Sequence, residues 1–120
     1  MSHIARVKSI FNDKDILKRA AQAIPGVRVE DNVTRRVYSQ THHGLAIFLP
    51  GWTFPVMVTE GGDAIYDNSL GSWGDQRHFD VLKRNYVASR AAAQLRSEGH
   101  RVTEHEQEDG SIEVLAEVDA

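Results

Sequence analysis

The chain has 120 residues, a length that fits a single domain spanning residues 1–120. Hydrophobic residues make up 41% and charged residues 26%, which is ordinary for a globular domain and excludes collagen-like, coiled-coil and intrinsically disordered chains. The chain has 14 Lys and Arg and 17 Asp and Glu, so its net charge is −3 at pH 7. We therefore do not expect a nucleic acid polymer as partner.

The sequence contains no cysteine, which excludes disulfides, thiolate catalysis and cysteine-ligated metal sites. Its longest apolar run, Leu45 to Pro50, is far too short to span a membrane. The first residues lack the apolar segment of a secretory signal. We therefore expect a cytoplasmic protein that has no membrane partner.

The first elements along the chain are a strand and a helix. Apolar and polar residues alternate from His3 to Phe11, which predicts a strand. Asn12 is a predicted helix N-cap, and the following helix has one apolar face. Pro25-Gly26 is expected to end it.

The middle of the chain is rich in strand patterns. Strands are predicted at residues 27–30, 33–40, 45–49, 54–60 and 64–67. Turns are predicted at Asp31-Asn32, at Thr41 to Gly44 and at Gly61 to Asp63. Because residues 45–49 are continuously apolar, we expect them to form a central strand.

The last third predicts a long helix and a hairpin. Asp75 is a good N-cap for a helix over residues 76–98, which Gly99 ends. Strands at 101–106 and 111–118 flank Asp109-Gly110. The order strand, helix, strands, helix, hairpin predicts an α+β fold, an antiparallel sheet with two helices packed on one face.

The long helix carries two apolar stripes. The first contains Phe79, Leu82, Tyr86 and Ala93, and the second contains Val81, Ala88, Ala92 and Leu95. One interpretation is that one stripe packs on the sheet and the other on the first helix. The alternative is that Ala88, Ala92 and Leu95 bind a partner protein or a second copy of the chain.

Aromatic and basic residues near the start of this helix suggest a ligand site. Trp52 and Trp73 lie beside glycines in loops, and Arg77, His78 and Arg84 follow Trp73. A nucleotide-like ligand would stack on tryptophan and face the arginines and the helix N-terminus. The alternative is that Trp73 anchors its loop and that Asp75 itself fills the anion position.

Catalytic and metal-binding patterns are weak. His42 and His43 are adjacent, so on a strand they would point to opposite faces, and the other histidines are isolated. The serines lie in none of the common nucleophile motifs. We therefore expect no catalytic residues, no metal and no cofactor, and keep a hydrolase or a metal enzyme using His42 and His43 as a further hypothesis.

Several segments together carry a family resemblance. They are the start MSH with its basic strand, GLAIFLPGW, DNSLGSWGD, RNYVA and QEDGSIEV, in this order. The pattern resembles the family called hypothetical chloroplast open reading frame 35, a conserved domain of unknown function with plastid, cyanobacterial, bacterial and phage members. Genes of that family often lie near genes for AAA+ ATPases, and the family has no established catalytic residues.

Two functional hypotheses follow. In the first, the protein is a non-catalytic adaptor that binds a protein, and the resemblance suggests a AAA+ ATPase as that partner. In the second, it is a phage-type protein that sequesters a nucleotide-like signal.

Overall fold

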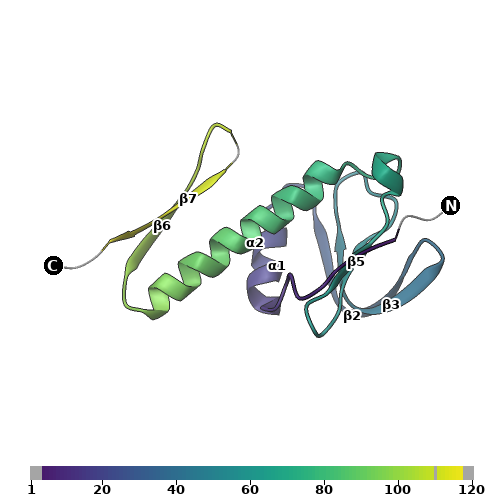
Figure 1. Ribbon diagram of the computed structural model, residues 1–120, viewed down its shortest axis with the longest axis horizontal. Coiled ribbons are helices and arrows are strands. Elements are labelled where there is room, and N and C mark those ends of the chain that lie inside the picture. Colours follow the sequence, from purple (N-terminus) through teal and green to yellow (C-terminus); the bar gives the residue numbers. More distant parts are fainter. Residues whose placement is uncertain (1–3, 110, 118–120) are drawn as a thin grey trace.

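The computed structural model describes residues 4–109 and 111–117 of the chain. Its strands are β1 (Ala5–Val7), β2 (Arg28–Val37), β3 (Gln40–Phe48), β4 (Val56–Val58), β5 (Ala64–Tyr66), β6 (Arg101–Glu106) and β7 (Ile112–Glu117). Its helices are α1 (Lys14–Gln22) and α2 (Gln76–Ser97), with a 3₁₀ turn η1 (Ser69–Gly71). The predicted α+β class and element order are confirmed (Figure 1).

Two separate antiparallel sheets make up the β structure. The main sheet has five strands in the order β1-β5-β4-β3-β2, and β6 and β7 form a two-stranded hairpin of their own. The sequence predicted the hairpin but not its separation from the main sheet. The predicted turn at Asp109-Gly110 and the predicted strand end at Val118 lie partly outside the described residues.

Both helices cover one face of the main sheet, as predicted. Leu45 and Ile47 of β3 point to this face and pack in one core with side chains of α1 and α2. Ala46, between them, points to the opposite face and packs with Val37 and Met57. The continuously apolar run therefore forms a strand that is buried on both faces, because each face has a core of its own.

The N-cap of α1 is one residue later than predicted. The Asp13 carboxylate accepts a hydrogen bond from Ile16 N at 3.1 Å. Asn12 instead donates from Nδ2 to the Ser9 carbonyl at 2.9 Å. Both residue types cap helices well, so the sequence alone does not choose between them.

The predicted turn at Thr41 to Gly44 is wrong, because these residues lie inside β3. The chain reverses earlier, and Tyr38 in this reversal adopts a left-handed φ of 52°. Gly44 serves the sheet instead: a Cβ there would lie 2.2 Å from the Val58 carbonyl oxygen of β4. Glycine is needed at this position because the two strands approach closely.

The predicted turn at Asp31-Asn32 is also wrong, because both residues lie within β2. The pairing of β2 with β3 shifts register between Glu30 and Val33, and Asn32 has a φ of 54°. The turn-forming residues therefore produce a bulge in a continuous strand.

Helix α2 makes the molecule elongated. The Cα radius of gyration is 15.4 Å and the longest axis is 57 Å, whereas a compact domain of this length has a radius of gyration of about 13.5 Å. One end of α2 packs on the sheet, and the other extends away from it toward the hairpin (Figure 1). Gly99, at φ +90°, ends the helix as predicted, and His100 N donates to the Leu95 carbonyl at 3.1 Å. This tight end turns the chain back, so that β6 and β7 both pack on α2.

Asp31 in the β2 bulge ties the main sheet to α1. Its carboxylate pairs with Lys14 Nζ at 2.7 Å and with Lys18 Nζ. Hydrogen bonds from Lys14 and then Lys18 lower the pKa of Asp31 from 3.8 to about 2.

This lowered pKa gives a pH-dependent stability. A carboxyl whose pKa is lower in the folded state stabilises the fold above its unfolded pKa, and loses that effect as the pH falls through the folded pKa. Asp31→Asn should therefore be less stable than wild type at neutral pH, and urea unfolding should show the gap shrinking between about pH 5 and about pH 2. In a Lys14→Met, Lys18→Met background the gap should be small at every pH; an equal gap there would contradict the assignment.

Candidate functional site

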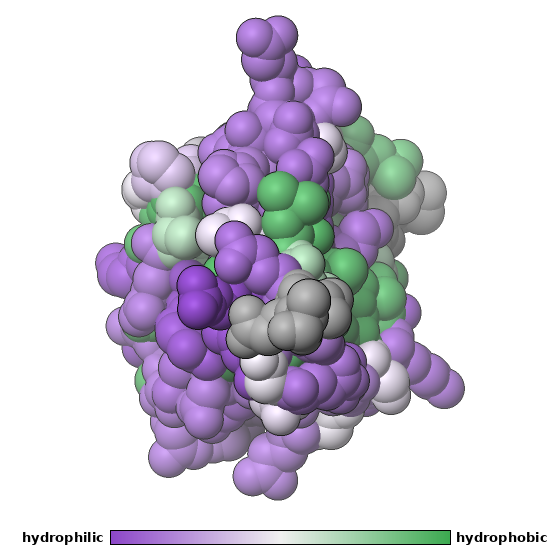
Figure 2. All heavy atoms as spheres, turned by 90° about the vertical axis from the view of Figure 1, so that its left-hand side faces the viewer, coloured by the Kyte–Doolittle hydropathy of each residue, from purple (hydrophilic) through white to green (hydrophobic). Residues whose placement is uncertain are grey.

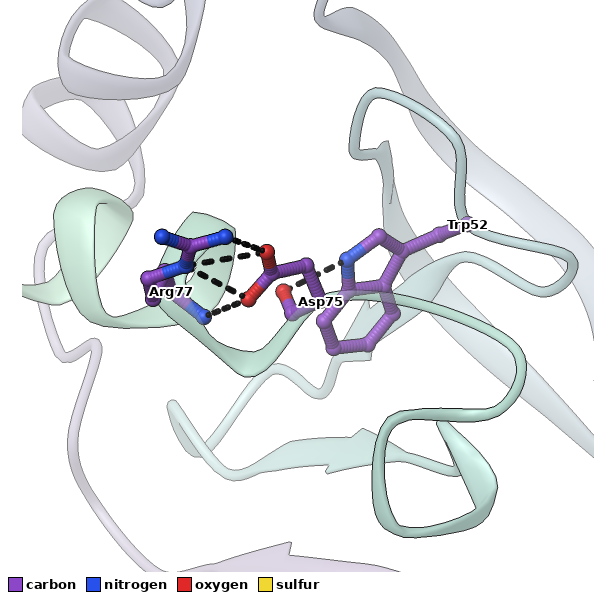
Figure 3. Close-up of polar contacts among 3 residues, drawn as sticks. All are labelled: Trp52, Asp75 and Arg77. Carbon is purple, nitrogen blue, oxygen red and sulfur yellow. Dashed lines mark hydrogen bonds and ion pairs between the residues drawn. The ribbon is translucent and has the colours of Figure 1, made fainter.

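Trp52 fixes the start of α2. Its indole Nε1 donates to the Asp75 carbonyl at 3.1 Å (Figure 3). The centroid of its ring lies 5.7 Å from that of the Tyr66 ring. A Cβ at Gly74 would lie 2.5 Å from the Trp52 ring, so the indole packs directly on the glycine backbone. The ring is therefore held in the structure by the residues that precede the helix.

Trp73 is held by a second group of aromatic side chains. Its ring stacks on Tyr38 with centroids 5.0 Å apart at an interplanar angle of 20°, and it meets Phe54 edge-on at 5.7 Å. Tyr38 lies at the reversal between β2 and β3, so this stack joins that hairpin to the loop before α2. The contacts correspond to the interpretation of Trp73 as a loop anchor.

Asp75 and Arg77 occupy the position that a ligand anion would take. The Asp75 carboxylate accepts a hydrogen bond from Arg77 N at 2.9 Å and pairs with the Arg77 guanidinium at 2.6 Å (Figure 3). Hydrogen bonds from the Arg77 side chain and backbone lower the pKa of Asp75 to about 2. The helix N-terminus and its nearest arginine are thus already paired with a carboxylate.

The other two predicted ligand residues lie further along α2. His78 is half-buried, and Arg84, two turns after Arg77, lines a groove between α2 and β7. Within residues 4–109 and 111–117, His78 Nδ1 and Arg84 Nε are buried without a hydrogen-bond partner. The five residues therefore serve different local structures, and a nucleotide-like ligand at them stays a prediction.

The second apolar stripe of α2 is covered by the chain itself. Ala88 is 7% exposed and Ala92 is 0% exposed. Ala88 shares a groove with Ile112 and Val114 of β7, which places the hairpin beside this stripe. Leu95 is half-buried at the helix end next to the hairpin. The sequence predicts either the first helix or a partner as the cover of this stripe. In the structure α1 and the hairpin both contact α2, and Val81 packs against the main core.

The hairpin leaves part of α2 open. A groove of about 450 Å³ runs between α2 and β7, and it is lined by Asp80, Lys83, Arg84, Val87, Ala88, Ala91, Ile112 and Val114. Val87, in its wall, is 59% exposed. The groove has an apolar interior with charged side chains among the residues that line it, which is the arrangement of many protein-docking sites.

Sequence reasoning missed Val87, Ile112 and Val114. On a helical wheel Val87 lies between the two stripes, among Asp80, Lys83 and Arg90. A single valine on a charged helix face is weak evidence, since isolated apolar residues are common on surfaces. The strand residues become informative only when the hairpin is placed against the helix.

His42 and His43 are engaged with neighbouring side chains. His43 contacts Thr34 Oγ1 through Nδ1 at 2.7 Å and Asn32 Oδ1 through Nε2 at 2.8 Å. His42 Nε2 lies 2.9 Å from Gln40 Oε1. Among the described residues, no group of three His, Asp or Glu side chains is placed to hold a metal ion.

Comparisons with family models, with curated proteins and with solved structures find no match for this chain. The family resemblance of the sequence therefore stays a prediction. Within the described ranges, no helix is long and apolar enough to cross a bilayer.

The contact between Trp52 and Gly74 predicts a large effect for a small substitution. Gly74→Ala would place a methyl group 2.5 Å from atoms of the Trp52 ring, which is too close for both to keep their positions. The substitution should therefore lower the free energy of unfolding by about 1–3 kcal/mol. Gly61→Ala is the matched control, because its nearest neighbour, Thr59 Oγ1, is 3.9 Å away. Chemical denaturation of both variants checks this; equal stability of the two would contradict the role of the glycine.

Proposed function

We propose that the protein is a non-catalytic binding module, and that it docks a partner protein in the groove between α2 and β7. The observation that carries the proposal is the groove itself, where Val87 is 59% exposed beside the half-buried Ile112 and Val114. A groove with these walls offers apolar area for burial and charged groups for selectivity.

The position of the groove supports docking. It lies along residues 80–91 of α2, on a side of the helix other than the one that packs in the core, and its wall residue Val87 is exposed to an approaching partner. Arg84, which lines the groove, adds a positive charge to its wall. Asp80 and Lys83 add charges of both signs to the same wall, and such groups give a docking site selectivity.

Viewed from the hairpin end, the surface is mainly hydrophilic, with apolar side chains gathered in patches at the centre and right of the view (Figure 2). A mixed surface of this kind fits a reversible interaction better than a permanent one, because permanent interfaces are more apolar. A AAA+ ATPase is the partner class that the family resemblance suggests.

A pair of matched variants tests the proposal. Val87→Glu puts a charge in the groove wall, and Leu70→Glu makes the same kind of change at η1, where Leu70 is 82% exposed. Both side chains are exposed, so both variants should fold as wild type does. A partner recovered with the tagged wild-type protein should bind the Val87→Glu variant at least about tenfold more weakly than wild type in calorimetry. A loss of this size is typical when a central interface residue is changed.

The Leu70→Glu variant should bind that partner with wild-type affinity. Equal binding by wild type and both variants, with the fold intact by circular dichroism, would contradict docking in the groove.

A further inference from the structure

The outer edge of β7 borders the groove. In the described residues β7 pairs with β6 alone. At the hairpin tip Gln107 N donates to the Ser111 carbonyl at 2.7 Å, which marks that pair as hydrogen-bonded. Hydrogen-bonded and non-hydrogen-bonded pairs alternate along an antiparallel ladder. The backbone N–H and C=O groups of Ile112, Val114 and Ala116 therefore point away from β6.

These free backbone groups and the groove belong to the same residues. Ile112 and Val114 also line the groove, opposite Val87 and Ala91 of α2. An extended segment placed about 4.8 Å from β7 would pair with the free edge. Every second side chain of that segment would point into the groove toward Val87 and Ala91.

A strand suits this position better than a helix. A helix in the groove would cover the free N–H and C=O groups of β7 without pairing them, and buried unpaired backbone groups are costly. A strand pairs them, as in other cases where a peptide extends a sheet. The occupant is thus an extended segment with apolar side chains on its inner face.

Charge defines the outer face of that segment. On the side of β7 away from α2, Leu115 is 47% exposed and lies between Glu113 and Glu117, which are both exposed. In an added strand, Lys or Arg at the two positions opposite these glutamates would stabilise the sheet, because cross-strand pairs of opposite charge are favourable. The residue between them would face Leu115.

A second copy of β7 offers less favourable charges than a basic segment. Antiparallel pairing centred on Leu115 would set Glu113 of each copy opposite Glu117 of the other, and like charges directly opposite are destabilising; pairing centred on Val114 avoids this but places no basic residue opposite either glutamate. The wider hairpin is acidic too, since residues 101–117 hold six Asp and Glu and one Arg. The charges therefore favour a different, basic protein.

We propose that the partner adds an extended segment to β7 as a third strand of the β6–β7 sheet, and that this segment has the pattern basic, apolar, apolar, apolar, basic. The inference rests on the proposed function, since it names the chemistry of the partner docked in the same groove. Main-chain pairing supplies part of the affinity, and the two glutamates select the basic flanks.

The test titrates a synthetic peptide into the full-length, isotope-labelled protein. The probe is acetyl-Thr-Lys-Val-Ile-Val-Lys-Thr-amide, and the matched control has Glu in place of both Lys. The probe should shift the NMR amide signals of Ile112, Val114 and Ala116, and the control should bind at least tenfold more weakly. Equal binding of the two peptides, or no binding of either, would overturn the proposal.

Backbone methylation separates strand addition from other binding. Two further probes carry N-methyl groups on alternate sets of nitrogens, because only one set can face β7. One of these probes should lose binding and the other should keep it. If both keep binding, or if the shifted signals are confined to α2, the strand model is wrong.

Protein variants complete the test. Glu113→Lys with Glu117→Lys should reverse the preference and favour the Glu peptide, whereas Glu108→Lys near the hairpin tip should keep the wild-type preference. An unchanged preference in the double variant would overturn the proposal. If the peptides fail these tests while Val87→Glu still abolishes binding of the natural partner, the groove remains the docking site and only the strand model fails.

Discussion

Helix α2 is longer than the core it helps to form, and this excess length shapes the rest of the molecule. Its 22 residues extend roughly 33 Å, but only its first half contributes the large core residues Phe79, Leu82 and Tyr86. The second half carries small apolar residues that water would otherwise reach. The chain folds its own C-terminal hairpin back over them, and that hairpin is too narrow to cover the whole exposed face. The groove and the free strand edge both follow from this incomplete cover.

The other end of α2 is firmly fixed. Trp52 packs on Gly74 and donates to the Asp75 carbonyl, while Asp75 caps the helix. The Trp73 stack holds the same loop against the β2–β3 reversal. The aromatic residues that first suggest a ligand site thus form a rigid base for the helix. A helix fixed by this packing presents the groove along residues 80–91 in a defined orientation, which lowers the entropic cost of docking a partner.

The sequence predicted the parts of this architecture that local chemistry determines. Asp75 and Gly99 are strong helix-end residues, so the bounds of α2 are correct within a residue or two. The two wrongly predicted turns in the middle of the chain both involve a residue at left-handed φ. Asn32 adopts this conformation in a strand bulge, although asparagine is also typical of turns. Tyr38 adopts it in the actual reversal, where the sequence gives no signal because tyrosine is uncommon at left-handed φ. The groove was not predictable, since it exists only between α2 and a strand that begins at Ile112, well after the helix ends at Ser97. The same holds for the contact between Trp52 and Gly74, which sequence spacing does not reveal.

The account depends most on β7 having one paired edge and one free edge, and amide hydrogen exchange of the isolated protein measures this directly. The N–H groups of Glu113 and Leu115, which face β6, should exchange slowly, and those of Ile112, Val114 and Ala116 should exchange quickly. Slow exchange at all five positions would mean that the outer edge is already covered. Fast exchange at all five would mean that β7 is not stably paired with β6, and either result would contradict the account.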